Sequence, residues 1–301
     1  MSKTLLITGA TGKQGGAVIK ALLAADADFN ILAVTRDTSS ESAKALEKQS
    51  PKVKTIQGNL NDPKAIFDTA GSPIWGVFSV QVPHAADQTS DPEEVQGKAL
   101  VDAALAHGVK HFVYTSVDRG TSRPNVPTNV PHFASKHHIE EHLLAKAGDK
   151  MTWTVIQPVA FLDNFSGYAP QFAAAFAAMW KSYLGEEKKL QVIASSDIGK
   201  VAARSFVQPE KYAGRKIPLA GDDLSYGDVK RIFNEKTGKE VPEAPEQVGR
   251  GFVESSADLK AMWVWFGTNG FGADIPALRT EFPDLLDYGN WLVKEGGYNS
   301  Q

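Results

Sequence analysis

The feature that most constrains the fold is a glycine-rich loop near the N-terminus, Gly9-Ala10-Thr11-Gly12-Lys13-Gln14-Gly15. It follows an apolar, strand-like run at Thr4–Thr8 and precedes a segment whose apolar residues recur with helical periodicity. In a dinucleotide-binding unit the first glycine permits a tight turn, the second lets the backbone approach a pyrophosphate, and the third lets the helix pack on the strand. The N–H groups and positive dipole end of the helix then favour a phosphate. The loop therefore predicts a dinucleotide site on a Rossmann fold.

The rest of the N-terminal half alternates between apolar runs and helix-like segments. Near-continuous apolar strands separated by helices predict βαβ units and a doubly wound parallel sheet covered on both faces. In such a sheet, ligands bind at the carboxyl ends of the strands. The further expected strands are 30–35, 53–56, 74–80, 111–115 and 153–156, and the expected helices lie near 41–49, 63–70, 93–107 and 133–147.

The alternation of strand-like and helix-like segments ends after Pro158. Residues 159–190 are rich in alanine, phenylalanine and tryptophan, without a clear strand pattern. A capped helix is expected from Asp197, a strand at 216–220, and helices at 226–236 and 285–294. We therefore expect a Rossmann domain at 1–158 and, at 159–301, a smaller, mostly helical cap that can return elements to the first domain.

Composition excludes several classes of protein. The 301 residues contain no cysteine, which excludes disulfides, thiolate metal sites and cysteine nucleophiles. The formal net charge is −3 and no basic stripe is evident, so direct binding of nucleic acid is not expected. No signal-peptide layout is present, and the apolar run at 172–180 is too short to span a bilayer. We expect a cytoplasmic protein without membrane contact, with the nucleus as an alternative location.

The residue after the second strand predicts which coenzyme binds. An acidic residue there would bind the ribose 2′-hydroxyl of NAD, whereas an arginine accommodates the 2′-phosphate of NADP. The chain has Arg36 at this position, which favours NADP(H). A phosphate-loop NTPase is excluded, because Gly12-Lys13 is followed by Gln14 and Gly9 lies too close to Gly12.

Two other patterns imitate catalytic motifs. His138 and His142 are one helical turn apart, but Ile139 occupies the place where a zincin needs glutamate, so we interpret them as a solvated helix face and expect no metal. Tyr212 and Lys216 have the Tyr-x-x-x-Lys spacing of short-chain dehydrogenases, but they lie in the region assigned to the cap. We interpret that spacing as a coincidence.

In short-chain dehydrogenases, the tyrosine of this motif is a general acid and the lysine lowers its pKa and holds the coenzyme ribose. Both stand on the helix after the fifth strand. Here Lys136 matches the lysine, and His132 stands where the tyrosine would be. His132 could transfer a proton near neutral pH if it faced the cleft, but we expect it to pack against the loop 121–131 instead.

This helix, 131–141, taken together with Gly9–Gly16, Thr35-Arg36 and 157–165, resembles the NmrA-like family, an atypical branch of the short-chain dehydrogenase superfamily. The resemblance extends to 287–292, and the pattern around Lys136 is closest to the NADP-sensing members. It implies contacts with each part of NADP(H). These are Gly9–Gln14 at the pyrophosphate, Arg36 at the 2′-phosphate, Asn59 (aspartate in the family) and Leu60 at the adenine, Val80, Gln81 and Lys136 at the nicotinamide ribose, and Pro158, Val159, Ala160 and Phe161 at the nicotinamide.

Three functions are compatible with this reading. The first is an NADP(H)-binding redox sensor that regulates a protein partner such as a transcription factor, which the missing tyrosine favours. The second is a reductase that passes hydride from NADPH to a quinone, an enone or a similar small electrophile. Relatives resembling isoflavone reductase use a lysine in this helix without the tyrosine, so Lys136 could donate a proton. The third is a module whose coenzyme binding is vestigial. The sequence leaves turnover and oligomeric state open.

Overall fold

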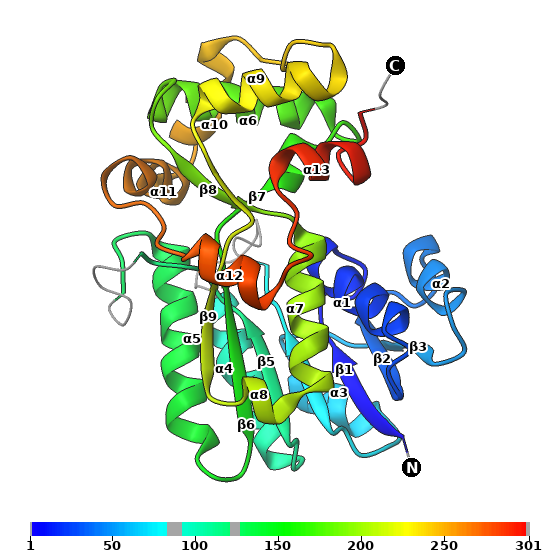
Figure 1. Cartoon of the computed structure of the whole chain (residues 1–301). Coiled ribbons are helices and arrows are strands. Elements are labelled where there is room, and N and C mark those ends of the chain that lie inside the picture. Colours follow the sequence, from blue (N-terminus) through cyan, green and yellow to red (C-terminus); the bar gives the residue numbers. More distant parts are fainter. Residues whose placement is uncertain (1, 83–91, 121–126, 299–301) are drawn as a thin grey trace. The chain divides into compact units, whose positions relative to one another are not determined.

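A computed structural model describes residues 2–82, 92–120 and 127–298 (Figure 1). Its larger sheet has seven strands in the order β3-β2-β1-β4-β5-β6-β9, and the pairs from β3 through β6 are parallel. The order reverses beside β1, which lies between β2 and β4. The predicted doubly wound parallel sheet is therefore confirmed. Its strands are β1 (Lys3–Ile7), β2 (Phe29–Thr35), β3 (Val53–Gln57), β4 (Gly76–Ser79), β5 (His111–Thr115), β6 (Thr152–Pro158) and β9 (Arg215–Leu219).

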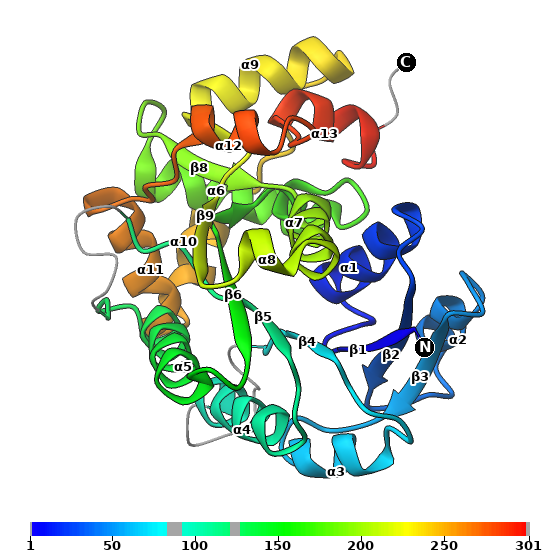
Figure 2. The same ribbon diagram turned by 60° about the horizontal axis from the view of Figure 1, so that its bottom comes forward.

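Helices cover both faces of this sheet, as Figure 2 shows. On one face, buried residues of α3, α4 and α5 join those of the strands in a single apolar cluster that includes Leu6, Leu100 and Leu143. On the other face α1 and α7 pack closely, because a Cβ at Gly199 would lie 2.4 Å from the backbone of Ala17. The helices are α1 (Lys13–Ala24), α2 (Glu41–Glu47), α3 (Pro63–Thr69), α4 (Pro92–Ala106), α5 (Pro131–Ala147), α7 (Ser195–Val207) and α8 (Pro209–Tyr212).

The chain divides into two compact units that differ from a simple division at Pro158. The first unit comprises 1–117, 134–157 and 196–217, and the second comprises 118–133, 158–195 and 218–301. Residues 196–217, which contain the predicted capped helix, therefore belong to the first unit, because α7 packs against the Rossmann helix α1.

The second unit contains a three-stranded sheet in the order β10-β8-β7 and most of the aromatic core. The long helix α6 falls in 159–190, inside the region predicted to be mostly helical, although no bounds for a helix were predicted there. It buries Phe176 and Trp180, which pack against Phe165. None of the helices in the described residues is long and apolar enough to cross a membrane. The elements of this unit are β7 (Ala160–Phe161), η1 (Leu162–Phe165), α6 (Pro170–Leu184), β8 (Leu190–Ile193), β10 (Asp222–Leu224), α9 (Tyr226–Thr237), α10 (Glu246–Glu254), α11 (Ala257–Thr268), α12 (Ile275–Glu281) and α13 (Tyr288–Lys294).

Candidate functional site

The glycine loop connects β1 to α1, and its glycines are required by the geometry. Gly9 has a φ of +58°, in the left-handed region, and a Cβ there would lie 2.5 Å from Val80. A Cβ on Gly15 would lie 2.4 Å from the carbonyl oxygen of Gly9, so the first turn of α1 packs directly on the loop. Gly12 occupies the N-cap without a side-chain cap, and the first turn carries no acidic residue. The N–H groups at this helix end are therefore available to an anion.

The end of β4 is joined to the loop by Thr8. The Thr8 hydroxyl donates to the Phe78 carbonyl at 3.0 Å and accepts from the backbone N–H of Val80 at 2.9 Å. Gln81 follows and is 3% exposed, and its amide nitrogen donates to Ser79. Its Oε1 atom has no hydrogen-bond partner among the described residues. A buried acceptor of this kind calls for a donor, such as a ribose hydroxyl.

Arg36 and Asn59 follow the carboxyl ends of the neighbouring strands β2 and β3. The ends of these strands are joined by a hydrogen bond from the Gly58 N–H to the Thr35 carbonyl at 2.9 Å. The Arg36 side chain is exposed and makes no ion pair or hydrogen bond with any residue that the structure describes. Asn59 uses its Oδ1 to accept from the Asn61 N–H at 3.0 Å, while Leu60 packs at the margin of the core cluster. Arg36 is therefore available to a phosphate.

Lys136 lies in α5 and forms an ion pair that the sequence did not predict. Its partner is Glu93, in the first turn of α4, and the pair is a short contact between Nζ and Oε1. The Glu93 side chain is fully buried and that of Lys136 is 12% exposed. The buried carboxylate supplies the countercharge for the Lys136 side chain and fixes its position. Lys136 is thus a hydrogen-bond donor fixed near the carboxyl edge of the sheet.

A second buried carboxylate, Glu140, lies one helical turn after Lys136. It accepts hydrogen bonds from the Ser116 hydroxyl and from the Gln157 amide, the latter at 3.0 Å. Lys216 approaches it at 3.0 Å. This network ties α5 to the ends of β5 and β6 and to β9, and fixes the orientation of the helix that carries Lys136. The sequence shows glutamates at 140 and 141, but no feature of the neighbouring residues predicts that Glu140 is buried.

In the second unit, the carboxylate of Asp258 binds His132 at two points. Its Nδ1 lies 2.6 Å from an oxygen of Asp258, whose other oxygen accepts the His132 backbone N–H at 3.0 Å. Asp258 therefore caps the start of α5. The predicted packing of His132 against the loop 121–131 falls partly outside the described residues.

The residues predicted at the nicotinamide also belong to the second unit, where β6 ends. Pro158 accepts a hydrogen bond from the Asp118 N–H at 3.1 Å, and Val159 is buried. Ala160 and Phe161 form β7 and remain partly exposed. Asp118 also accepts from the N–H groups of Gly120 and Gly272 at 2.5 and 3.2 Å, yet burial raises the pKa of its carboxyl group.

The two imitations of catalytic motifs have separate structural explanations. His138 and His142 bond to different carboxylates, Glu94 at 2.7 Å and Asp102 at 2.8 Å. Tyr212 ends α8, whereas Lys216 lies in β9, so they do not share a helix face. The Tyr212–Lys216 segment was wrongly assigned to the cap and belongs to the first unit, because the Thr154 hydroxyl of β6 donates to the Tyr212 carbonyl.

The first unit thus fits NADP(H) on its own features. Predicted residues follow the carboxyl ends of four adjacent parallel strands, in the order Asn59 and Leu60 (β3), Arg36 (β2), Gly9–Gly15 (β1), and Val80 and Gln81 (β4). An uncapped helix N-terminus suits the pyrophosphate, the Arg36 side chain, unpaired among the described residues, suits the 2′-phosphate, and Gln81 offers an acceptor.

The sequence model of the NmrA-like family matches residues 1–286. The chain belongs to the NmrA-like family. Curated relatives are similar along most of this NmrA-like chain. An NmrA-like family domain-containing protein of Dictyostelium discoideum is 26% identical over 303 residues, covering 98% of each chain. The oxidoreductase FrzB of a Cladobotryum species is 27% identical over 298 residues, covering 90% of this chain and 85% of the relative.

Solved structures share the fold of this NmrA-like protein at lower identity. The triphenylmethane reductase of a Citrobacter species, complexed with NADP(H), has a TM-score of 0.71 and 19% identity, covering 96% of this chain and 98% of that one. The NADPH-dependent quinone oxidoreductase of Escherichia coli, complexed with NADPH, has a TM-score of 0.70 and 22% identity, covering 95% and 97%. At these identities the likeness concerns the fold.

Proposed function

We propose that this NmrA-like protein binds NADPH and reduces a small electrophile of the quinone or enone type. The observation that carries the proposal is the ion pair between Lys136 and the buried Glu93, in the same unit as the glycine loop. The names of the relatives support it, because FrzB is described as an oxidoreductase and the solved neighbours as reductases of quinones and triphenylmethane dyes.

Each part of the coenzyme has a proposed place in the first unit. The N-terminus of α1 holds the pyrophosphate, Arg36 holds the 2′-phosphate, and Gln81 accepts a hydrogen bond from the nicotinamide ribose. Bound NADPH supplies the hydride, which brings two electrons to the electrophile. The oxygen of a quinone or enone then needs a proton, and the Lys136 ammonium supplies one. Glu93 keeps that ammonium oriented through their ion pair.

A redox-sensing regulator is the second candidate. The observation in its favour is that His132 replaces the tyrosine and is bound to Asp258. In that function a protein partner, such as a transcription factor, would respond to the bound coenzyme. The two proposals differ in turnover: a sensor binds NADP(H) without consuming it.

The deciding experiment follows NADPH oxidation with a quinone, an enone and a triphenylmethane dye. We expect turnover with at least one of them and a fall in kcat of about 10²-fold or more in Lys136→Ala at saturating NADPH. Lys146→Ala, at an exposed position of the same helix, is the matched control and should retain full activity. Tight NADPH binding without any turnover would instead favour the sensor.

A further inference from the structure

A cleft of about 850 Å³ lies at the amino ends of the strands in the first unit. It is lined by the first residues of β1, by Asn30–Leu32 of β2, by residues 51–54 at the start of β3, and by segments 70–75 and 107–110, which lead into β4 and β5. Figure 2 brings this edge of the sheet forward, beside the N-terminus. The glycine loop follows the opposite, carboxyl end of β1. The cleft is therefore separate from the coenzyme site.

The cleft carries positive charge without lining carboxylates. Its lysines are Lys3, Lys52, Lys54 and Lys110, and its lining includes no aspartate or glutamate. Lys52 forms an ion pair at 3.2 Å with Asp26, whose side chain is 98% exposed. The ammonium groups of Lys54 and Lys110 form no ion pair with any residue in the described ranges. A concave surface with charges of one sign concentrates counter-ions, so this cleft favours an anion.

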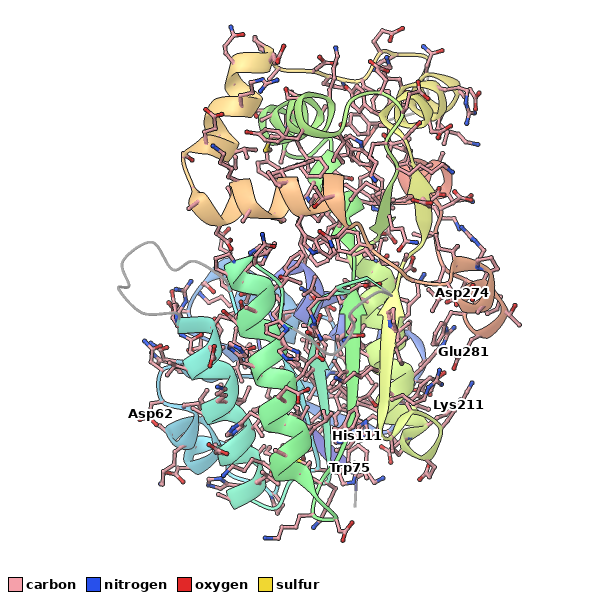
Figure 3. The ribbon with its side chains drawn as sticks, turned by 90° about the vertical axis from the view of Figure 1, so that its left-hand side faces the viewer. Asp62, Trp75, His111, Lys211, Asp274 and Glu281 are labelled. Carbon is pink, nitrogen blue, oxygen red and sulfur yellow. The ribbon has the colours of Figure 1, made fainter. Side chains whose placement is uncertain are left out.

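The walls between the lysines are apolar. Pro51 and Pro73 contribute exposed aliphatic surface, and Trp75 contributes an aromatic ring. Figure 3 shows Trp75 and His111 at this end of the unit, and their ring centroids are 6.1 Å apart. Burial lowers the pKa of His111 to about 4, so the ring behind Trp75 is neutral at physiological pH. Trp75 is therefore held between packed aromatic rings, and the Lys3 ammonium lies 3.9 Å from the centroid of its ring, so this wall combines apolar surface with a positive charge.

The size and lining together indicate a small-molecule ligand. Sites for small molecules typically enclose about 300–1,000 Å³ and combine apolar walls with a few polar groups. Here the polar groups include four ammonium ions. We propose that the cleft binds a small organic anion in which an apolar, planar body carries a phosphate, sulfonate or carboxylate group.

A ligand in this cleft lies too far from the glycine loop to be the substrate of a hydride transfer there. Strand β1 has five residues, which at about 3.3 Å per residue places its two ends about 16 Å apart. Reacting atoms must approach to about 3–3.5 Å, so a molecule in this cleft cannot receive a hydride from the site at the glycine loop. The inference stands independently of the reductase proposal.

The test is calorimetric titration with 1-naphthyl phosphate in the presence of excess NADPH, which keeps the coenzyme site occupied. Titrations with 1-naphthol and with inorganic phosphate separate the apolar contribution from the charge. We expect one molecule of naphthyl phosphate per chain, bound about tenfold or more tightly than either fragment, with affinity that falls as salt rises.

Paired variants then locate the site. The double variant Lys54→Glu/Lys110→Glu should weaken binding about tenfold or more, because two favourable charges become repulsive. Lys20→Glu/Lys48→Glu makes the same change of net charge at exposed lysines outside the cleft and should leave affinity within about twofold. Equal weakening by both pairs, no binding at millimolar probe, or stoichiometry well above one would overturn the proposal. Circular dichroism checks that both pairs are folded.

Discussion

Arg36 is the residue on which the choice of coenzyme depends. Its guanidinium is exposed and unpaired among the described residues, so a 2′-phosphate meets no competing carboxylate there. A charge-assisted hydrogen bond contributes about 1.5–3 kcal/mol, which corresponds to about a 10- to 100-fold preference for NADPH over NADH. Arg36→Glu should erase or reverse that preference in fluorescence titrations, whereas Lys48→Glu, an equal charge change at the end of α2, should keep it. Equal affinities for both coenzymes in the unmodified protein would contradict the assignment.

Glu93 and Glu94 are adjacent residues in the first turn of α4 with different surroundings. Glu93 is fully buried against Lys136, whereas Glu94 is partly exposed and pairs with Lys98 and His138. Glu93→Gln leaves the largely buried ammonium without its countercharge, which should cost about 2–4 kcal/mol of unfolding free energy and reduce kcat. Glu94→Gln, the matched control, should cost about 1 kcal/mol or less. Urea unfolding measures both, and similar losses would show that the Lys136–Glu93 pair has no special importance.

At the scale of elements, the β1–α1 turn carries the proposed phosphate site. Gly12 has a φ of −93°, which any residue can adopt, so Gly12→Val should fold. Its branched side chain would occupy the space over the helix N-terminus, and NADPH binding should fall below detection. Binding is measured by calorimetry and folding by circular dichroism. A folded variant with unchanged affinity would place the coenzyme elsewhere.

At the scale of the whole molecule, His111 makes stability depend on pH. Burial lowers its pKa to about 4 in the folded protein, against 6.5 for an ordinary histidine. Between pH 6.5 and pH 4, His111 is protonated in the unfolded chain but stays neutral in the folded protein. Its contribution to the free energy of unfolding is therefore complete above pH 6.5 and is lost as the pH falls towards 4. The loss amounts to about 3 kcal/mol.

This dependence can be isolated by substitution. In urea unfolding, the change between pH 7 and pH 4 should shrink by about that amount in His111→Gln. The exposed His138→Gln should leave the slope as it is in the unmodified protein. An unaltered slope in His111→Gln would assign the acid sensitivity to other groups.

Local signals in the sequence were enough to predict the doubly wound sheet, the glycine loop and the family. Apolar runs predicted β1 to β6 within two residues at most ends, and Gly9 and Gly15 are constrained by the backbone geometry of the turn between β1 and α1. The bounds of α6 were not predicted, because this helix is apolar on several sides. In a helix that is buried nearly all round, the apolar residues show only weak helical periodicity.

The partners of the charged side chains and the limits of the compact units could be identified only in the folded chain. Glu93 contacts Lys136, which lies 43 residues later in the sequence, and Asp258 contacts His132, which lies 126 residues earlier. Nothing local marks either carboxylate as buried, because burial depends on which helices pack together. In the same way α7 joins the first unit through its contact with α1, although its sequence lies beyond Pro158. Local patterns specify backbone conformation, whereas the pairing of distant charges follows from packing.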